Sequence, residues 1–120
     1  MNNSGNVRTI GGDQVICTVQ ANNAEAVTGP GRLYYILVDN LSAVDLYLCG
    51  WDATAVPADG AFDSTLLFIC RVYAGTVTEL NIAGGLPFTD GFVAAVSTSG
   101  TAMVAAGTSQ CNFTLIYAKR

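Results

Sequence analysis

The stretch "DLYLCGWDATAVPADG", residues 45–60, shows how this chain passes from strand to turn. The apolar run 45–51 has the length and composition of a β-strand. The residues that follow it include several of the types that form turns, namely Asp52, Pro57, Asp59 and Gly60. The sequence therefore predicts a strand followed by an acidic loop. It leaves open whether that loop is a binding site or a corner of the scaffold.

The same pattern of short strands and turns extends over the rest of the chain. No segment carries an apolar stripe of helical period and length. We predict strands at 13–20, 32–40, 45–51, 65–73, 76–82, 91–97, 101–106 and 111–118. Turn residues separate them at 28–31, 40–43, 57–60, 84–85, 99–100 and 107–109. This predicts an all-β fold, a single-domain antiparallel β-sandwich that is jelly-roll-like with about eight strands. Residues 13–120 would form the sandwich and residues 1–12 an extended N-terminal arm.

Alternation along each strand predicts which side chains face the core, because alternate residues share a face. The expected inward residues are Val15, Cys17, Val19, Leu66, Phe68, Cys70, Val72, Leu80, Ile82, Cys111, Phe113, Leu115 and Tyr117. Strand 32–40 is apolar on both faces, which predicts a central strand covered on both sides.

Composition and charge exclude several classes of function. Hydrophobic residues make up 51% of the chain and charged residues only 12%, whereas an ordinary domain carries about a quarter charged residues. Such a surface packs readily against another protein. The five basic residues are scattered and the net charge is −4, so we expect no direct binding of nucleic acid. No run of about 18 apolar residues predicts a membrane span, and the polar first residues argue against a signal peptide.

The chain contains no histidine. This excludes Ser-His-Asp and Cys-His catalysis and histidine-ligated zinc. Any enzyme with this sequence would have to use carboxylates, Lys or Tyr alone. We expect no enzyme, no catalytic residues, no cofactor and no metal.

The four cysteines, Cys17, Cys49, Cys70 and Cys111, allow two interpretations. They could form two disulfides, with three possible pairings, or they could be free, buried thiols that act as small hydrophobic residues. We favour the second, because three of them share the predicted core face. No CxxC spacing suggests a zinc site.

Two further groups of residues could form binding sites. The carboxylates Asp52, Asp59 and Asp63 flank one loop and could bind calcium, but aspartate is also an ordinary turn residue, which we favour. The aromatic residues Trp51, Tyr34, Tyr35, Tyr47 and Tyr73 could form a platform for sugar rings. Core packing or an interface anchor is the interpretation that we favour for them.

Two segments together resemble a known class of proteins. "YYILVDNLSAVDLYLCGWDATAVPADG", residues 34–60, is a strand ending in Asn, a short link, a Tyr-Leu strand ending in Asp and a Val-Pro-x-x-Gly turn. "GGLPFTDGFVAAVSTSG", residues 84–100, adds a Gly-x-x-Phe-x-x-Gly turn and an apolar strand ending in Ser-Thr. This order resembles small β-sandwich virion proteins of tailed bacteriophages, over about residues 31–100.

The resemblance implies a structural protein of the virion, assembled in the host bacterial cytoplasm. The expected role is a capsid decoration or cement protein that binds the outside of the phage head and stabilises it. Its partners would be the major capsid protein or other virion proteins, and copies of itself in a homo-oligomer. Another virion position (tail, neck or fibre anchor) and a carbohydrate-binding module are the alternatives.

We expect the interface to lie on the arm, on the loops 52–63 and 84–91, and on the C-terminal stretch 114–120. The residues expected there are Asn2, Asn3, Asn6, Val7, Arg8, Trp51, Asp52, Pro57, Asp59, Pro87, Phe88, Lys119 and Arg120.

Overall fold

The fold consists of antiparallel β-strands, and the part of the chain that the structure describes contains no helix. The computed structural model describes residues 7–10, 13–20, 24–106 and 111–119. The strands are β1 (Val7–Ile10), β2 (Asp13–Gln20), β3 (Ala24–Thr28), β4 (Gly31–Asn40), β5 (Leu46–Trp51), β6 (Gly60–Ala61), β7 (Leu66–Val72), β8 (Val77–Phe88), β9 (Gly91–Ser97), β10 (Ala102–Met103) and β11 (Cys111–Lys119). The predicted all-β, antiparallel, single-domain fold is confirmed.

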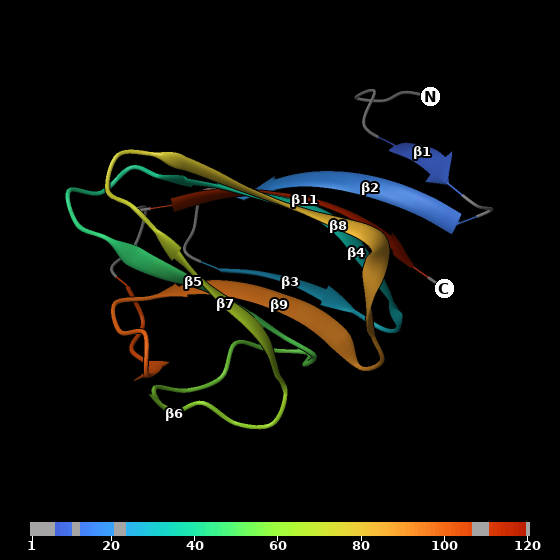
Figure 1. Ribbon diagram of the computed structural model, residues 1–120. Coiled ribbons are helices and arrows are strands. Elements are labelled where there is room, and N and C mark those ends of the chain that lie inside the picture. Colours follow the sequence, from blue (N-terminus) through green and yellow to red (C-terminus); the bar gives the residue numbers. More distant parts are fainter. Residues whose placement is uncertain (1–6, 11–12, 21–23, 107–110, 120) are drawn as a thin grey trace.

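Two sheets face one another (Figure 1). The first has the order β1-β2-β11-β4-β8 and the second has the order β3-β9-β5-β7. Most connections between long strands carry the chain from one sheet to the other, so neighbours in a sheet are distant in sequence. The strands β6 and β10 form a separate two-stranded ribbon beneath the second sheet (Figure 1).

The main core fills the space between the two sheets. Its fully buried members include Leu33, Ile36 and Val38 of β4, and Phe113 and Leu115 of β11. The predicted alternation is confirmed for most residues of β7, β8 and β11: Phe68, Cys70, Val72, Leu80, Ile82, Cys111, Phe113, Leu115 and Tyr117 belong to the main core or pack against it, whereas Ile69 and Arg71 are exposed. The prediction is wrong for Leu66, which packs on the other face of the second sheet, because the pairing of β7 with β5 shifts register there and Leu67 faces the main core instead. The side chains of Val15, Cys17 and Val19 lie outside the described residues.

A second core lies on the other face of the β5/β9 pair. Cys49, Trp51, Val93, Ala95 and Met103 are buried there, with Phe62 packed against them. The loop between β5 and β7, together with β10, covers this face as a third layer. It follows that β9 is buried along its whole length.

The expectation of a strand covered on both faces is therefore met by β9 and not by β4. On β4 the inward residues are buried, but the side chains of Tyr35, Leu37 and Asp39 on the outer face are only half-buried. Ala94 of β9 faces the main core, whereas Ala95 faces the third layer.

Several predicted strand boundaries were wrong. The strands β1, β3 and β6 were not predicted, and residues 7–10 pair with β2 as a hairpin although we placed them in an extended arm. Gly84 and Gly85, predicted as a turn, lie inside β8, where their φ angles are +79° and +82°. The pairing of β8 with β4 shifts register there, between Leu33 and Tyr35. Paired glycines with positive φ here form an irregularity within a strand, because only glycine adopts that conformation without strain.

Candidate functional site

The loop that follows β5 begins with a carboxylate that holds a distant turn. Asp52 accepts hydrogen bonds from the backbone N–H groups of Thr89 (3.0 Å), Asp90 (2.9 Å) and Gly91 (3.3 Å), and from the Thr89 hydroxyl (3.0 Å). Burial alone would raise the pKa of Asp52, but these hydrogen bonds outweigh it and lower the pKa. The carboxylate thus fastens the β8–β9 turn to the end of β5. Its oxygens are already engaged by groups of the chain itself.

The two other carboxylates of this loop also bond to the backbone. Asp59 accepts a hydrogen bond from the Ala105 N–H at 3.0 Å. Asp63 accepts hydrogen bonds from the hydroxyl and the N–H of Thr65, and these lower its pKa. The described residues contain no group of three or more Asp, Glu or Cys side chains placed to hold a metal ion. Asp63 therefore bonds within its own turn, as the turn interpretation predicts. The prediction of local bonding is wrong for Asp52 and Asp59, whose partners lie 37 to 39 and 46 positions away in the sequence.

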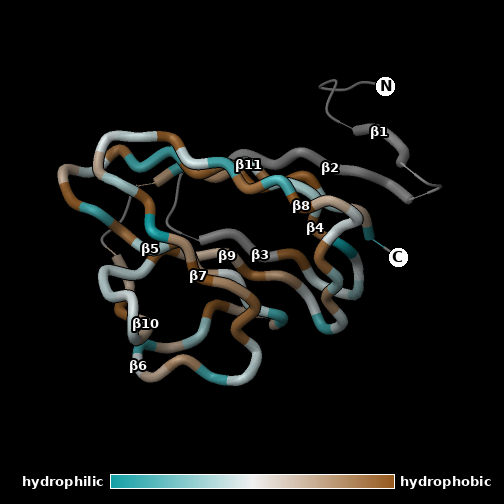
Figure 2. Tube along the Cα trace, in the orientation of Figure 1, coloured by the Kyte–Doolittle hydropathy of each residue, from teal (hydrophilic) through white to brown (hydrophobic). Residues whose placement is uncertain are grey.

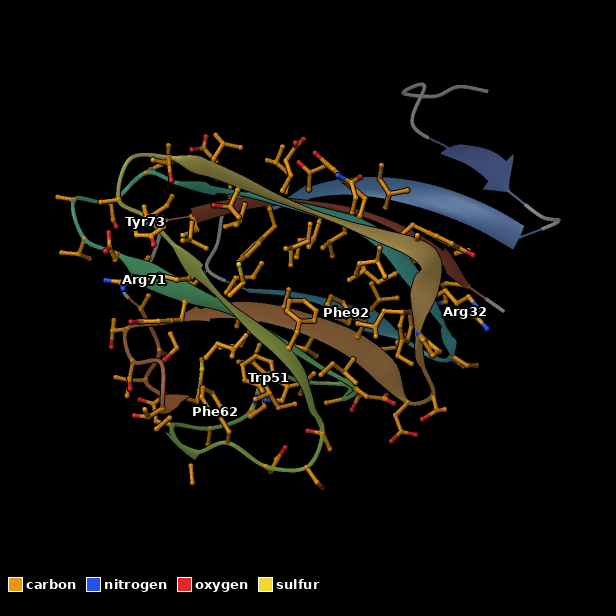
Figure 3. The ribbon with its side chains drawn as sticks, in the orientation of Figure 1. Arg32, Trp51, Phe62, Arg71, Tyr73 and Phe92 are labelled. Atoms are coloured by element: carbon orange, nitrogen blue, oxygen red, sulfur yellow. The ribbon has the colours of Figure 1, made fainter. Side chains whose placement is uncertain are left out.

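Two of the expected interface residues are core residues. Trp51 is 1% exposed and Phe88 is 2% exposed. Trp51 packs against Phe62, with ring centroids 6.5 Å apart, in the second core (Figure 3). Phe88 packs against Phe92 in the main core, with ring centroids 5.8 Å apart. Neither side chain is accessible to another protein or to a sugar. The prediction that Trp51 and Phe88 are interface residues is therefore wrong, and Trp51 cannot be part of a sugar platform.

The remaining expected interface residues have different positions. Pro87, Asp59 and Lys119 are exposed, whereas Asp52 and Pro57 are half-buried. Val7 and Arg8 lie in β1, paired with β2. Asn2, Asn3, Asn6 and Arg120 lie outside the described residues. The structure therefore spreads this set over separate parts of the molecule, although Asp52 bonds the turn 89–91 that directly follows Pro87 and Phe88 at the end of β8.

Burial makes two of the described cysteine thiols unreactive. Cys49 and Cys70 are free, which confirms the prediction for these two. Burial raises the pKa of Cys49 to about 12 and that of Cys111 to about 11. A thiol with such a pKa stays protonated near neutral pH and is a poor nucleophile.

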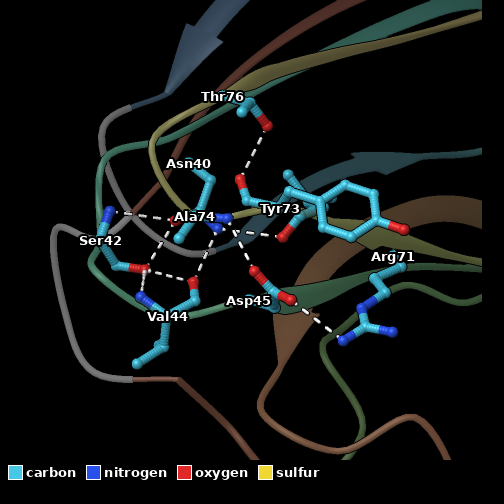
Figure 4. A network of polar contacts seen from close by, with 9 residues as sticks. Asn40, Ser42, Val44, Asp45, Arg71, Tyr73, Ala74 and Thr76 are labelled. Carbon is cyan, nitrogen blue, oxygen red and sulfur yellow. Dashed lines mark hydrogen bonds and ion pairs between the residues drawn. The ribbon is translucent and has the colours of Figure 1, made fainter.

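A polar network at the opposite end of the sandwich connects the β4–β5 link with the β7–β8 turn (Figure 4). The buried Asn40 donates from Nδ2 to the carbonyls of Val44 (3.0 Å) and Val72 (3.1 Å). Its Oδ1 accepts hydrogen bonds from the N–H and the hydroxyl of Ser42. One fully buried amide thus fixes the course of both connections.

An arginine stacked between two tyrosines lies beside this network. The Arg71 guanidinium carbon is 5.9 Å from the centre of the Tyr47 ring and 5.3 Å from that of Tyr73. Arg71 also bonds Asp45, with Nη2 and Oδ2 3.0 Å apart. Asp45 accepts a second hydrogen bond from the Ala74 N–H, which with Arg71 lowers the pKa of Asp45. The guanidinium is therefore held in one orientation while its side chain stays 52% exposed.

Exposed hydrophobic side chains lie around this cluster. Leu41, Val44, Tyr73 and Val77 are between 54% and 58% exposed, more than any other large hydrophobic side chain described. Figure 2 shows the apolar link between β4 and β5 at this end of the molecule. We call these four residues and Arg71 the end surface. Tyrosine and arginine are enriched among the residues that carry most of the energy in protein interfaces, so this surface has the chemistry of a protein-binding site.

The sequence offers Tyr47 and Tyr73 as part of a sugar platform or, as we favour, as packing residues or interface anchors, and it does not single out Leu41, Val44 or Arg71. A signal was present, because apolar residues in the short link 41–45 have no place in the alternation of a strand. Only the fold, however, brings this link beside Tyr73 and Val77.

Comparison of the chain with protein-family models, with curated proteins and with solved structures found no match. The described part of the chain also contains no helix long and apolar enough to cross a membrane. An assignment of function therefore has to be argued from the end surface and the fold.

Proposed function

We propose that this protein is a structural subunit of a virion, and most specifically a decoration or cement protein that binds the outside of a tailed-bacteriophage head. The observation that carries the proposal is the end surface, where a fixed arginine and an exposed tyrosine lie among three exposed aliphatic side chains. A rigid, mostly apolar surface of this kind suits binding to another protein. The resemblance of residues 31–100 to such virion proteins supports the choice of partner.

We further infer that the sandwich is a jelly roll. Of the eight strands with five or more residues, the first sheet contains the first, eighth, third and sixth, and the second sheet contains the second, seventh, fourth and fifth. This order results from two Greek keys folded onto each other, which is the jelly-roll arrangement found in capsid and lectin domains. The topology supports a virion protein and is equally compatible with a sugar-binding protein.

The proposed mechanism is stabilisation by mass action. A protein that binds the assembled shell and not its dissociated subunits favours the assembled shell. Many weak contacts repeated over a lattice add up to firm attachment, because each bound subunit holds its neighbours at high effective concentration.

A carbohydrate-binding module is the second candidate, and one observation favours it. The Tyr73 ring is 57% exposed and lies beside the hydrogen-bonding groups of Arg71 and Asp45. An aromatic face next to such groups can stack on a sugar ring. Glycan-array binding that is lost in the Tyr73→Ala variant would favour this function over head binding.

Location in the particle tests the proposal and separates the virion roles. Virions from the phage that encodes this sequence would be labelled with gold-conjugated antibody against the chain and imaged by electron microscopy. We expect regularly spaced label over the head surface. Label on the tail, the neck or the fibre base would replace the decoration role with one of the other virion positions. A purified particle without this protein, verified by mass spectrometry, would overturn the virion proposal.

A further inference from the structure

The long strand β8 is an edge strand of the first sheet as far as the structure describes the chain. Within the described residues β8 has β4 as its neighbour on one side and no strand on the other. An unpaired edge presents a row of backbone N–H and C=O groups to which another strand can bond. The question is which part of this edge is open and what fits it.

The hydrogen-bond pattern shows which residues face outward. The Asn40 N–H donates to the Thr76 carbonyl at 2.9 Å, and the two strands continue in antiparallel register with Asp39 opposite Val77. Backbone groups alternate between the two sides of an antiparallel strand. Those of Thr78 and Leu80 therefore point to β4, and those of Val77, Glu79 and Asn81 point to the open edge.

Only half of this edge is protected against pairing. The irregularity at Gly84 and Gly85, followed by Pro87, interrupts the second half of β8, and both devices are known to block edge pairing. The first half, residues 77–83, has no proline and no glycine, and Glu79 is its only charged residue.

The inner face of this half is also incompletely covered. Leu80 and Ile82 pack against the main core but stay half-buried, whereas Ile36, which lies opposite Leu80 on β4, is 0% exposed. A further strand beside β8 would complete their burial.

We propose that residues 77–83 of β8 pair with the same residues of a second copy, antiparallel across a two-fold axis at Leu80. The two five-stranded sheets then become one continuous sheet. In this register the outward-facing residues pair with one another, Glu79 with Asn81 and Val77 with Ala83, so the open backbone groups of both copies are satisfied.

The charge pattern selects this register over its neighbours. A two-fold axis at Glu79 would put two carboxylates directly opposite each other, which is unfavourable. An axis at Asn81 would leave Glu79 opposite Ala83 and bring Val77 against the irregular Gly85. An axis at Leu80 places each Glu79 carboxylate opposite an Asn81 amide, which can donate a hydrogen bond to it. The edge is thus complementary to itself, as a two-fold interface requires.

This inference goes beyond the proposed function and does not depend on it, because a sheet-edge dimer can form whether or not the protein binds a virion. The test is sedimentation equilibrium of the purified chain and of three variants, each checked for native circular dichroism. Asn81→Glu puts like charges opposite each other at two symmetric positions, and Asn81→Lys puts opposite charges there. Ile69→Glu adds the same charge on β7 of the second sheet, where the exposed Ile69 side chain points away from the main core.

We expect a dimer whose dissociation constant rises at least about fivefold in Asn81→Glu and falls in Asn81→Lys, with Ile69→Glu close to the unchanged chain. Opposite effects of two substitutions at one exposed position cannot come from loss of folding. A chain that stays monomeric at all concentrations up to about 1 mM would overturn the proposal. The proposal would also be overturned if both Asn81 variants changed the dissociation constant in the same direction. It would be overturned as well if Ile69→Glu raised the dissociation constant as much as Asn81→Glu.

Discussion

Asp52 illustrates how single polar side chains fix the connections of this fold. Its carboxylate accepts hydrogen bonds from residues 89–91. At the other end of the sandwich, the side-chain amide of Asn40 donates a hydrogen bond to the carbonyl of Val72. In both cases a residue directly at the end of a strand, or the last residue in it, holds a turn that is distant in sequence. The sequence shows such residues as turn-formers, but the partners of Asp52, and Val72 among the partners of Asn40, lie more than 30 positions away and become visible only in the fold.

Replacing Asp52 by alanine removes the acceptor of this turn. We expect Asp52→Ala to lower the free energy of unfolding by about 1–3 kcal/mol, because several N–H groups lose a charged partner. Urea denaturation measures this value. The neighbouring Asp90→Ala is the control and should change stability by less than about 0.5 kcal/mol, since Asp90 is exposed. Equal losses in the two variants would contradict the assigned role of Asp52.

Acid should weaken the fold through the same carboxylates. Asp52 and Asp63 have lowered pKa values in the folded chain, so the unfolded chain binds protons more readily as the pH falls. The contribution of these carboxylates to the free energy of unfolding is fully present above the ordinary aspartate pKa of about 4. It is lost as the pH falls through their lower pKa values in the folded chain. Urea midpoints from about pH 6 down to about pH 2.5 should therefore fall less steeply for Asp52→Asn than for the unchanged chain. Parallel curves would show that Asp52 does not contribute.

At the scale of the elements, alternation and turn residues predict most of the strands that build the main core. The pattern in β7 and β11 was readable because inward apolar residues alternate with Arg71, Asn112 and Thr114. The strands β1 and β3 escaped prediction because short segments with few large apolar residues become strands only when a neighbour pairs with them. The pair Gly84-Gly85 was misassigned because glycines with positive φ form turns and strand irregularities alike.

The two glycines of β8 have the same backbone conformation but different surroundings. A Cβ at Gly85 would lie 2.9 Å from Cε1 of Tyr34, whereas a Cβ at Gly84 would meet nothing within 4 Å. Gly84→Ala should cost about 1–2 kcal/mol for the left-handed conformation alone. Gly85→Ala should cost more, because Tyr34 must also move. Chemical denaturation of the two variants compares these costs, and a milder effect of Gly85→Ala would contradict the described packing.

At the scale of the whole molecule, the loop after β5 is a third layer that closes a second core, and not only a corner of the sandwich. Trp51 lies beneath this layer with Cys49, Val93 and Met103. The sequence could not predict this burial, because it depends on where a loop without regular alternation docks. The end surface escaped prediction for a similar reason, since the fold brings together two links that are far apart in the chain.

The third layer can be tested with the intrinsic fluorescence of Trp51, the only tryptophan of the chain. We expect blue-shifted emission and weak quenching by acrylamide in the native protein, because the indole is 1% exposed. Phe62→Ala should increase the quenching, since the Phe62 ring packs on Trp51. Val56→Ala, in the same loop and 41% exposed, should not. Native quenching as strong as in the unfolded chain would contradict the third layer.

Binding of the purified chain to phage heads that lack it tests the proposed function most directly. We predict saturable co-sedimentation with the heads, and an affinity at least about thirtyfold lower for Tyr73→Ala, as for other central tyrosines of interfaces. The control variant Val56→Ala should bind like the unchanged chain. Absence of saturable binding would contradict the decoration role, and full binding by Tyr73→Ala would contradict the end surface as the site that performs it.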